Sequence, residues 1–225
     1  MHIGLIGGIG PAATVAYYTR LVKKFKATGI PLELTIAHAD IEVLSRNATT
    51  DQRQAQGEVF AAHFDRLAAA GCDVGVITAL TGHFCFEETR QLSPIKLVNA
   101  ADVIDQYCTE HGIKTLGLLG SPPVLTTKLF GLLTSAQVVV PQTELEEIGR
   151  AYMEVATSGV CDDVTRANLF RAGASMIDTQ GAEAVLLAGT DLGLAFNGQT
   201  PGFRVIDALE LHVDALVSLA NKQCS

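Results

Sequence analysis

Short apolar runs alternate with longer amphipathic segments along the whole chain. The apolar runs predict strands, and they cover residues 2–7, 32–39, 73–78, 95–99, 114–120, 136–141, 182–189 and 203–206. Helical patterns lie between them: one opens at Pro11, one follows Pro123, and others cover 50–70, 101–111, 144–157, 162–179 and 207–221. Nearly continuous apolar strands that alternate with helices are typical of parallel sheets covered on both faces.

The pattern also repeats within the chain. "HIGLIGGIGP" (2–11) and "TLGLLGSPP" (115–123) each read as a strand, a tight turn, a proline and a helix. "DVGVITALT" (73–81) and "EAVLLAGTD" (183–191) each begin with an acid and become apolar, so Ala79 and Gly189 are equivalent. We therefore predict an α/β protein of two similar flavodoxin-like parallel-sheet halves related by a pseudo-twofold duplication.

The expected halves are residues 1–99 with 207–225, and residues 100–206. Ligands of open α/β sheets bind beyond the carboxyl ends of the strands. The site is therefore expected in a cleft between the two halves. The loops after residues 7, 78, 120 and 188 would line it.

Composition and charge narrow the function classes. The 225 residues are 48% hydrophobic and 18% charged, which is typical of an ordered globular protein. The net charge is −8 and the one basic cluster is Lys23, Lys24 and Lys26, which argues against nucleic-acid binding. The N-terminus lacks a signal-peptide pattern, and no apolar run is long enough to suggest a membrane span. Five scattered cysteines without a C-x-x-C pair favour a reduced cytoplasmic protein without disulfides or zinc.

The glycine turn "GGIGPAAT" (7–14) admits three interpretations. It loosely matches a dinucleotide fingerprint, in which His38 and Asp40 would bind the ribose. Asp40 lies about ten residues beyond the usual position of such an acid, and Pro11 lacks the backbone N–H that a pyrophosphate would need. The turn could instead be a tight connection, or N–H groups from Gly8 to Gly10 could hold one small carboxylate.

Three segments together resemble the aspartate/glutamate racemase family. "IGLIGGIGPAATVAYYTRL" (3–21) is similar to the opening of that family, a strand followed by G-G-x-G-P-x-A-T and a helix with a tyrosine pair. "VITALTGHF" (76–84) is similar to the first catalytic segment, normally apolar-apolar-x-C-N-T-A-H. "LLAGTDL" (186–192) is similar to the second, normally G-C-T-E-apolar. The resemblance implies a cofactor-independent enzyme, usually dimeric, in which two cysteines move a proton on opposite faces of a substrate α-carbon.

Both cysteine positions are replaced in this chain. Ala79 and Leu80 stand where the family has cysteine and asparagine, and Gly189 stands at the second cysteine. Asp191 replaces a glutamate, whereas Thr81, His83 and Thr190 are retained. Alanine and glycine cannot transfer a proton, so ordinary two-cysteine racemisation is excluded. Loss of two thiols is also expected to leave a wider cleft.

His83 and Asp191 are the candidate acid/base groups. The pKa of histidine suits proton transfer near neutral pH, and a carboxylate can act as a base or bind a substrate ammonium. Each also has a structural interpretation, His83 bonding a loop carbonyl or capping a helix, and Asp191 capping a helix. Cys85 could act as a low-pKa thiol or be inert core, and the Thr78 hydroxyl would reach the cleft only if the register slipped.

The candidate substrate-binding residues come from the turns and from the resemblance. They are Gly8, Gly10, Arg46, Ala79, Leu80, Thr81, Ser121, Gly189 and Thr190. Arg46, with Arg53 as second choice, would match an arginine that binds the distal carboxylate, or would be a solvated loop residue. Arg166 is near a basic position of the helix after residue 160, and Ser121 could hold the α-carboxylate.

Three functions follow. The first is a racemase-like isomerase or related lyase without cofactor or metal, acting at the α-carbon of a small amino or carboxylic acid with a non-standard acid/base set. The second is a catalytically silent homologue that binds a small dicarboxylate or amino acid. The third, a nucleotide-dependent enzyme, is disfavoured by the duplicated strand ends and the missing basic pocket. A cytoplasmic homodimer is expected.

Overall fold

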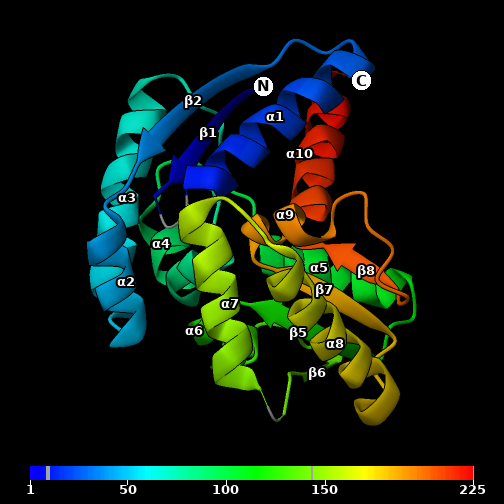
Figure 1. Cartoon of the computed structure of the whole chain (residues 1–225). Coiled ribbons are helices and arrows are strands. Elements are labelled where there is room, and N and C mark those ends of the chain that lie inside the picture. Colours follow the sequence, from blue (N-terminus) through cyan, green and yellow to red (C-terminus); the bar gives the residue numbers. More distant parts are fainter. Residues whose placement is uncertain (9–10, 143, 225) are drawn as a thin grey trace. The chain divides into compact units, whose positions relative to one another are not determined.

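Two compact units make up the chain, each built on one four-stranded parallel sheet (Figure 1). The computed structural model describes residues 1–8, 11–142 and 144–224. Unit 1 comprises residues 1–100 and the chain from Leu209 onward, and unit 2 comprises residues 101–208. The strand orders are β2-β1-β3-β4 and β6-β5-β7-β8, so the topology repeats strand for strand. The predicted α/β fold of two similar parallel-sheet halves is confirmed.

Unit 1 places helices on both faces of its sheet. Its strands are β1 (His2–Gly7), β2 (Glu33–His38), β3 (Val74–Ile77) and β4 (Lys96–Leu97). Its helices are α1 (Pro11–Thr28), α2 (Ile41–Thr49), α3 (Arg53–Ala69), the 3-10 helix η1 (Leu80–Cys85), α4 (Phe86–Leu92) and α10 (Ala208–Cys224). The apolar sides of α1 and α10 form one core with β1 and β3, and Lys24 of α1 pairs with Glu210 of α10 at 2.8 Å. The two helices therefore lie side by side (Figure 1).

The opposite face of this sheet is covered by α3. An added Cβ at Gly75 of β3 would collide with the Phe64 ring, and one at Gly4 of β1 would lie 3.0 Å from Leu67. Glycine at these positions lets the helix approach the strands closely.

The helix predicted over 50–70 is found as α3, and a helix that the sequence analysis did not predict precedes it. Residues 41–49 form α2, which begins because the Asp40 carboxylate accepts hydrogen bonds from the backbone N–H groups of Glu42 (2.8 Å) and Val43 (3.2 Å). Thr49, Thr50 and Asp51 precede α3 and are of residue types that cap helices, but none of them is its N-cap. Its N-cap is Gln52, which makes no side-chain cap bond.

Unit 2 repeats the arrangement with a more buried sheet. Its strands are β5 (Thr115–Gly120), β6 (Gln137–Val139), β7 (Ala184–Ala188) and β8 (Val205–Asp207). Its helices are α5 (Ala100–Glu110), α6 (Pro122–Thr126), η2 (Leu129–Gly131), α7 (Leu145–Ser158), α8 (Asp163–Gln180), η3 (Thr190–Leu192) and α9 (Gly193–Phe196). Every residue of β7 is buried, and Met176 of α8 packs over Gly117 of β5.

The register brings particular residues together at the carboxyl edge of each sheet. Ile6 pairs with Ile77 in unit 1, and Gly120 pairs with Ala188 in unit 2. Ala79 and Gly189 each precede a 3-10 helix in extended backbone, with φ of −118° and −147°. Their predicted equivalence is confirmed. Among the described helices, none has the length and apolar character needed to cross a membrane.

Candidate functional site

In unit 1 the ends of β1 and β3 bring Gly8 near the segment Ala79–Thr81. Gly8 has φ of +144°, and an added Cβ would lie 2.9 Å from the Ala39 carbonyl carbon, so both backbone and space require glycine. Ala79 and Thr81 are half-buried, and Leu80 is buried. Gly10, predicted beside Gly8, lies outside the described residues.

The hydroxyl and thiol nearest this edge are already engaged. The Thr78 hydroxyl donates to the Ile6 carbonyl at 3.0 Å and lies 3.3 Å from the Thr14 hydroxyl. Cys85 is fully buried with its Sγ toward the Gly82 carbonyl, and burial raises the pKa of this thiol to about 12. Cys85 is therefore protonated at neutral pH and matches the inert-core interpretation.

His83 is buried with both ring nitrogens in hydrogen bonds. Nε2 accepts the backbone N–H of Ala100 at 3.2 Å, so Nδ1 carries the proton and donates to the Ala79 carbonyl at 3.1 Å. Burial lowers the pKa of His83 to about 4, so the ring is neutral at pH 7. The imidazole thus holds the backbone of Ala79 in place, and its expected catalytic role stays a prediction.

A second buried histidine, which the sequence did not single out, lies beside His83. The rings of His83 and His212 are 6.3 Å apart between centroids. His212 Nε2 donates to the Val98 carbonyl at 3.1 Å, and its Nδ1 accepts from the Tyr17 hydroxyl at 2.8 Å. Burial lowers the pKa of His212 to about 3. This neutral network joins α1 and α10 to the segment before α5.

Arg46 lies exposed on α2. No ion pair involves its guanidinium within the described part of the chain, whereas Arg53 pairs with Asp51 at 2.8 Å. Of the two candidate arginines, Arg46 is therefore the one available to an anionic ligand.

In unit 2 the ends of β5 and β7 bring Ser121 near the segment Gly189–Asp191. Ser121 precedes α6, whose first turn holds Pro122 and Pro123. Ser121, Thr190 and Asp191 are all buried. This edge therefore gathers the polar groups that the duplication predicted for the second half.

Asp191 is the buried acid of this edge, with 3% of its surface exposed. Its Oδ2 accepts a hydrogen bond from the Tyr152 hydroxyl at 3.1 Å. Its Oδ1 is buried and has no hydrogen-bond donor among the described residues. Burial raises the pKa of Asp191 above its ordinary value, and the Tyr152 hydroxyl opposes that shift. A buried oxygen without a donor is the kind of group that a ligand or a proton satisfies.

The side chain of Tyr152 occupies the space next to Gly189. Tyr152 belongs to α7, is 7% exposed, and has a pKa raised well above the usual value by burial and by the nearby Asp191 charge. A Cβ added to Gly189 would lie 2.7 Å from the ring carbon Cζ and 2.9 Å from the hydroxyl oxygen. The backbone of Gly189 suits any residue, so the tyrosine is what requires glycine there. The expectation of a wider cleft is wrong at this position, because the Tyr152 ring fills the space beside Gly189.

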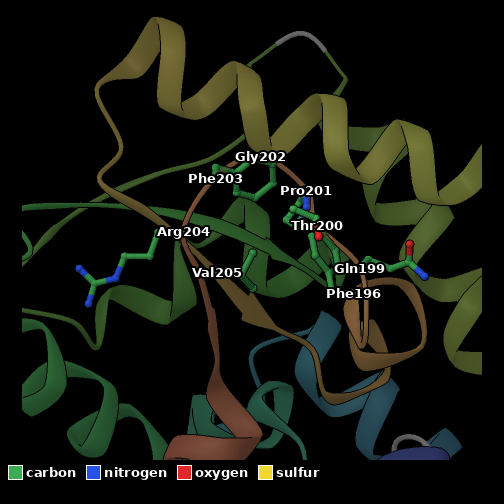
Figure 2. Close-up of a pocket in the computed structure, with 8 residues that line it drawn as sticks. All are labelled: Phe196, Gln199, Thr200, Pro201, Gly202, Phe203, Arg204 and Val205. Atoms are coloured by element: carbon green, nitrogen blue, oxygen red, sulfur yellow. The ribbon is translucent and has the colours of Figure 1, made fainter.

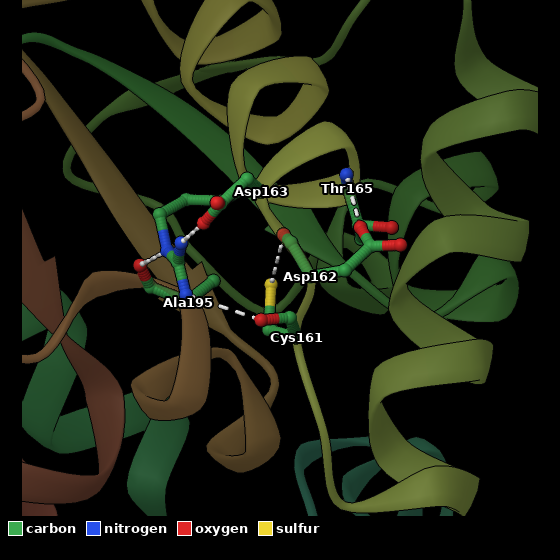
Figure 3. A network of polar contacts seen from close by, with 6 residues as sticks. Cys161, Asp162, Asp163, Thr165 and Ala195 are labelled. Atoms are coloured by element: carbon green, nitrogen blue, oxygen red, sulfur yellow. Dashed lines mark hydrogen bonds and ion pairs between the residues drawn. The ribbon is translucent and has the colours of Figure 1, made fainter.

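Arg166 has a structural role in unit 2 (Figure 3). Its guanidinium donates to the carbonyls of Cys161 (3.1 Å) and Ala195 (3.2 Å) and pairs with Asp163 at 2.5 Å. Asp162 beside it caps α8 by accepting the N–H of Thr165 at 2.7 Å. The network joins the start of α8 to α9. The Arg166 guanidinium is therefore already paired within unit 2.

A surface hollow of about 480 Å³ lies apart from these strand ends. Figure 2 shows its lining, which is Phe196 and residues 199–205. These residues precede β8 or belong to its start, so the hollow lies at the amino edge of the sheet. The Arg204 guanidinium points away from Phe203 and donates to the Tyr107 hydroxyl at 3.3 Å. No acid/base group faces this hollow among the lining residues.

Metal and dinucleotide sites find little support in the described residues. Within residues 1–8, 11–142 and 144–224, no three His, Cys, Asp or Glu side chains cluster as metal ligands would. Asp40, the ribose ligand of the dinucleotide interpretation, caps α2 instead.

Comparison with known proteins agrees with the resemblance seen in the sequence. Residues 6–216 match the family described as Asp/Glu/hydantoin racemase. An aspartate racemase homologue from Pyrococcus horikoshii superposes with a TM-score of 0.81 at 24% identity, covering 98% of this chain and 99% of that one. The aspartate racemase of Picrophilus torridus gives 0.79 at 19%, covering 98% and 95%. Glutamate racemase from Francisella tularensis, solved with D-glutamate, gives 0.65 at 12%, covering 99% and 81%.

Proposed function

Because the chain belongs to the Asp/Glu/hydantoin racemase family, we propose that it is an isomerase-type enzyme with a non-standard acid/base set. It acts at the α-carbon of a small amino or carboxylic acid, or of a close derivative. The buried Asp191 carboxylate at the end of β7, with its unpartnered Oδ1, carries this proposal. The reaction uses no pyridoxal phosphate or other cofactor.

Asp191 is the proposed base. Its Oδ1 takes the proton from the substrate Cα–H, and the electron pair of that bond stays on the substrate, delocalised into the adjacent carbonyl group. The protonated Asp191 then returns the proton to the same carbon. With one proton carrier on the protein, most protons return on the face they left, and the isomer forms when water protonates the opposite face of the planar anion.

The base narrows the substrate class. A carboxylate is a weaker base than a thiolate, since the ordinary pKa values of Asp and Cys are about 3.9 and 8.5. Proton transfer is efficient when acid and base are matched. We therefore propose a substrate whose Cα–H is more acidic than that of a free amino acid, such as a malonate-type acid or a hydantoin.

The substrate-binding residues remain those proposed from the sequence. In unit 1, backbone N–H groups near Gly8 and Leu80 with the Thr81 hydroxyl suit a small carboxylate. In unit 2, the backbone N–H of Gly189 with the hydroxyls of Ser121 and Thr190 does so as well. The exposed Arg46 suits a second, distal carboxylate. A glutamate racemase that holds D-glutamate on the same fold supports a ligand of this size. His83 has a positioning role, because it fixes the carbonyl of Ala79.

A second candidate is a silent homologue that binds the ligand without turnover. Ala79 and the engaged His83 favour it, because neither offers a free proton carrier in unit 1. Saturable ligand binding with no exchange of the ligand Cα–H would identify this case.

The proposed setting is a cytoplasmic homodimer. The cysteines described are free thiols, and Cys72, Cys85 and Cys108 are buried, which suits a reducing compartment. Val15, Tyr18 and Val22 form an exposed apolar row on α1, with exposed fractions of 62%, 50% and 41%. A second copy of the chain is the proposed partner for this row.

Proton exchange in D₂O tests the function. L- and D-amino acids, malonate-type acids and a 5-substituted hydantoin are incubated with the protein, and loss of the Cα–H signal is followed by NMR. We expect exchange on at least one activated acid, reduced about 100-fold or more in Asp191→Asn. The exposed Asp178→Asn on α8 is the matched control and should keep the wild-type rate. Absence of exchange on the whole panel would contradict the proposal.

A further inference from the structure

The space beside Gly189 is filled by a side chain from α7. Tyr152 enters from α7, and its hydroxyl oxygen lies 2.9 Å from where a Cβ on residue 189 would stand. In the family pattern that Cβ would carry the second thiol. A polar atom therefore lies within 2.9 Å of the point from which that thiol would project.

We propose that Tyr152 is the positioning residue that replaces the second thiol: its ring fills the room left by Gly189, and its hydroxyl holds Asp191 through Oδ2, leaving Oδ1 free for the substrate. The catalytic consequence rests on the proposed function. The pairing itself concerns only contacts within unit 2. The replacement of the cysteine by Gly189, the aspartate at 191 and the tyrosine at 152 then form one coordinated change.

The hydrogen bond determines how Asp191 behaves. A phenol that donates to a carboxylate stabilises the charged form, whereas burial stabilises the neutral form. Tyr152 therefore keeps a buried carboxylate ionised over more of the pH range in which it must accept a proton. It also fixes the rotation of the carboxylate, because Oδ2 is hydrogen-bonded to Tyr152 of α7 whereas Oδ1 has no donor among the described residues.

Other ionisable groups do not compete for Asp191. The elements with the most contacts to η3 are α7, β7 and α9, and β7 and α9 carry no titratable side chain. On α7, Tyr152 is the buried titratable residue, and the others are exposed, namely Glu146, Glu147, Arg150 and Glu154. A change in Asp191 titration on altering Tyr152 can therefore be assigned to the pair.

The test is Tyr152→Phe, which removes the hydroxyl and keeps the ring. The pKa of Asp191 is measured by carboxyl ¹³C NMR on protein labelled in aspartate, with Asp191→Asn assigning the signal. The pKa should rise by about one unit or more, since hydrogen bonds to charged groups are worth about 1.5–3 kcal/mol. The acid limb of the exchange profile should move up by the same amount. Tyr107→Phe, which removes a hydroxyl elsewhere in unit 2, should change neither.

The outcomes separate this inference from the proposed function. An unchanged Asp191 pKa in Tyr152→Phe overturns the inference, even if wild-type exchange is observed and the variant is less stable. A raised pKa with no exchange in any protein supports the pairing and overturns the proposed function. A raised pKa with a shifted exchange profile supports both.

Discussion

The equivalent residues Gly189 and Ala79 have different surroundings at the ends of their strands. The backbone of Gly189 is extended, with φ of −147°, so glycine is not needed for its conformation. It is needed because a tyrosine ring from α7 lies where a side chain would start. The equivalent residue Ala79 is only half-buried and carries its own Cβ. The two equivalent positions therefore differ in whether a neighbouring side chain fills the space beside them.

Restoring the family cysteine should be tolerated at one position and not at the other. Gly189→Cys should cost about 2–3 kcal/mol of unfolding free energy, because overpacking forces the Tyr152 ring to move. Ala79→Cys is the matched control and should stay within about 0.5 kcal/mol of wild type. Urea unfolding of both variants measures the difference. Equal stability of Gly189→Cys and wild type would contradict the assigned contact.

At the level of helices and strands, two buried histidines join separate elements of unit 1. His212 lies on α10 and bonds to Tyr17 on α1 and to the Val98 carbonyl, and His83 ties the end of η1 to the start of α5. Both rings are neutral in the folded protein, with pKa values of about 3 and about 4. In the unfolded chain the pKa of each is about 6.5.

The difference in histidine pKa between the folded and unfolded states predicts that the folded protein loses stability in acid. The loss begins at a higher pH than the range in which carboxylates titrate. Below pH 6.5 the unfolded chain binds protons that the folded protein excludes, so stability is full above that pH and falls as the pH drops toward the folded pKa values. At pH 5 each histidine should cost about 2 kcal/mol relative to pH 7.5. Urea unfolding at the two pH values should show a loss of about 4 kcal/mol from the pair.

His212→Gln isolates one of the two contributions. This variant should lose only about half as much stability between pH 7.5 and 5.0. His111→Gln, at the exposed end of α5, should lose as much as wild type. A His212→Gln variant with undiminished pH dependence would rule out the buried neutral ring.

Some elements could be predicted from the sequence because their signals are local. The strands and their duplication follow from apolar runs, and α8 follows from its caps, Asp162 and Gly181. Helix α2 was missed although Asp40 is an N-cap residue, because Asn47 and Thr49 are weak helix formers. The same Asp40 was instead considered as a nucleotide ligand.

Only the part of the candidate site that lies at the carboxyl ends of the strands could be predicted from the sequence. The equivalence of Ala79 and Gly189 comes from the repeat, and both lie where it places them. Tyr152 gave no signal, because its contact with Gly189 and Asp191 joins segments far apart in sequence. The engagement of both nitrogens of His83 was equally hidden, since it depends on the backbone of Ala100.

For the whole molecule, the apolar row on α1 predicts association. Val15, Tyr18 and Val22 would be covered by a second copy of the chain. Sedimentation velocity at micromolar concentration should give a dimer, and Tyr18→Glu should shift it toward monomer. Glu58→Gln, at an exposed position on α3, serves as the control. A wild-type monomer would contradict the proposed homodimer.

The most direct test of the account combines exchange with stereochemistry. Single enantiomers of a 5-substituted hydantoin and of aspartate are incubated in D₂O at pH 7, and deuterium incorporation and enantiomer ratio are followed together. One carboxylate carrier predicts that deuterium enters faster than the configuration inverts, and that Asp191→Asn abolishes both. Racemisation as fast as exchange would require a second proton carrier and would contradict the account.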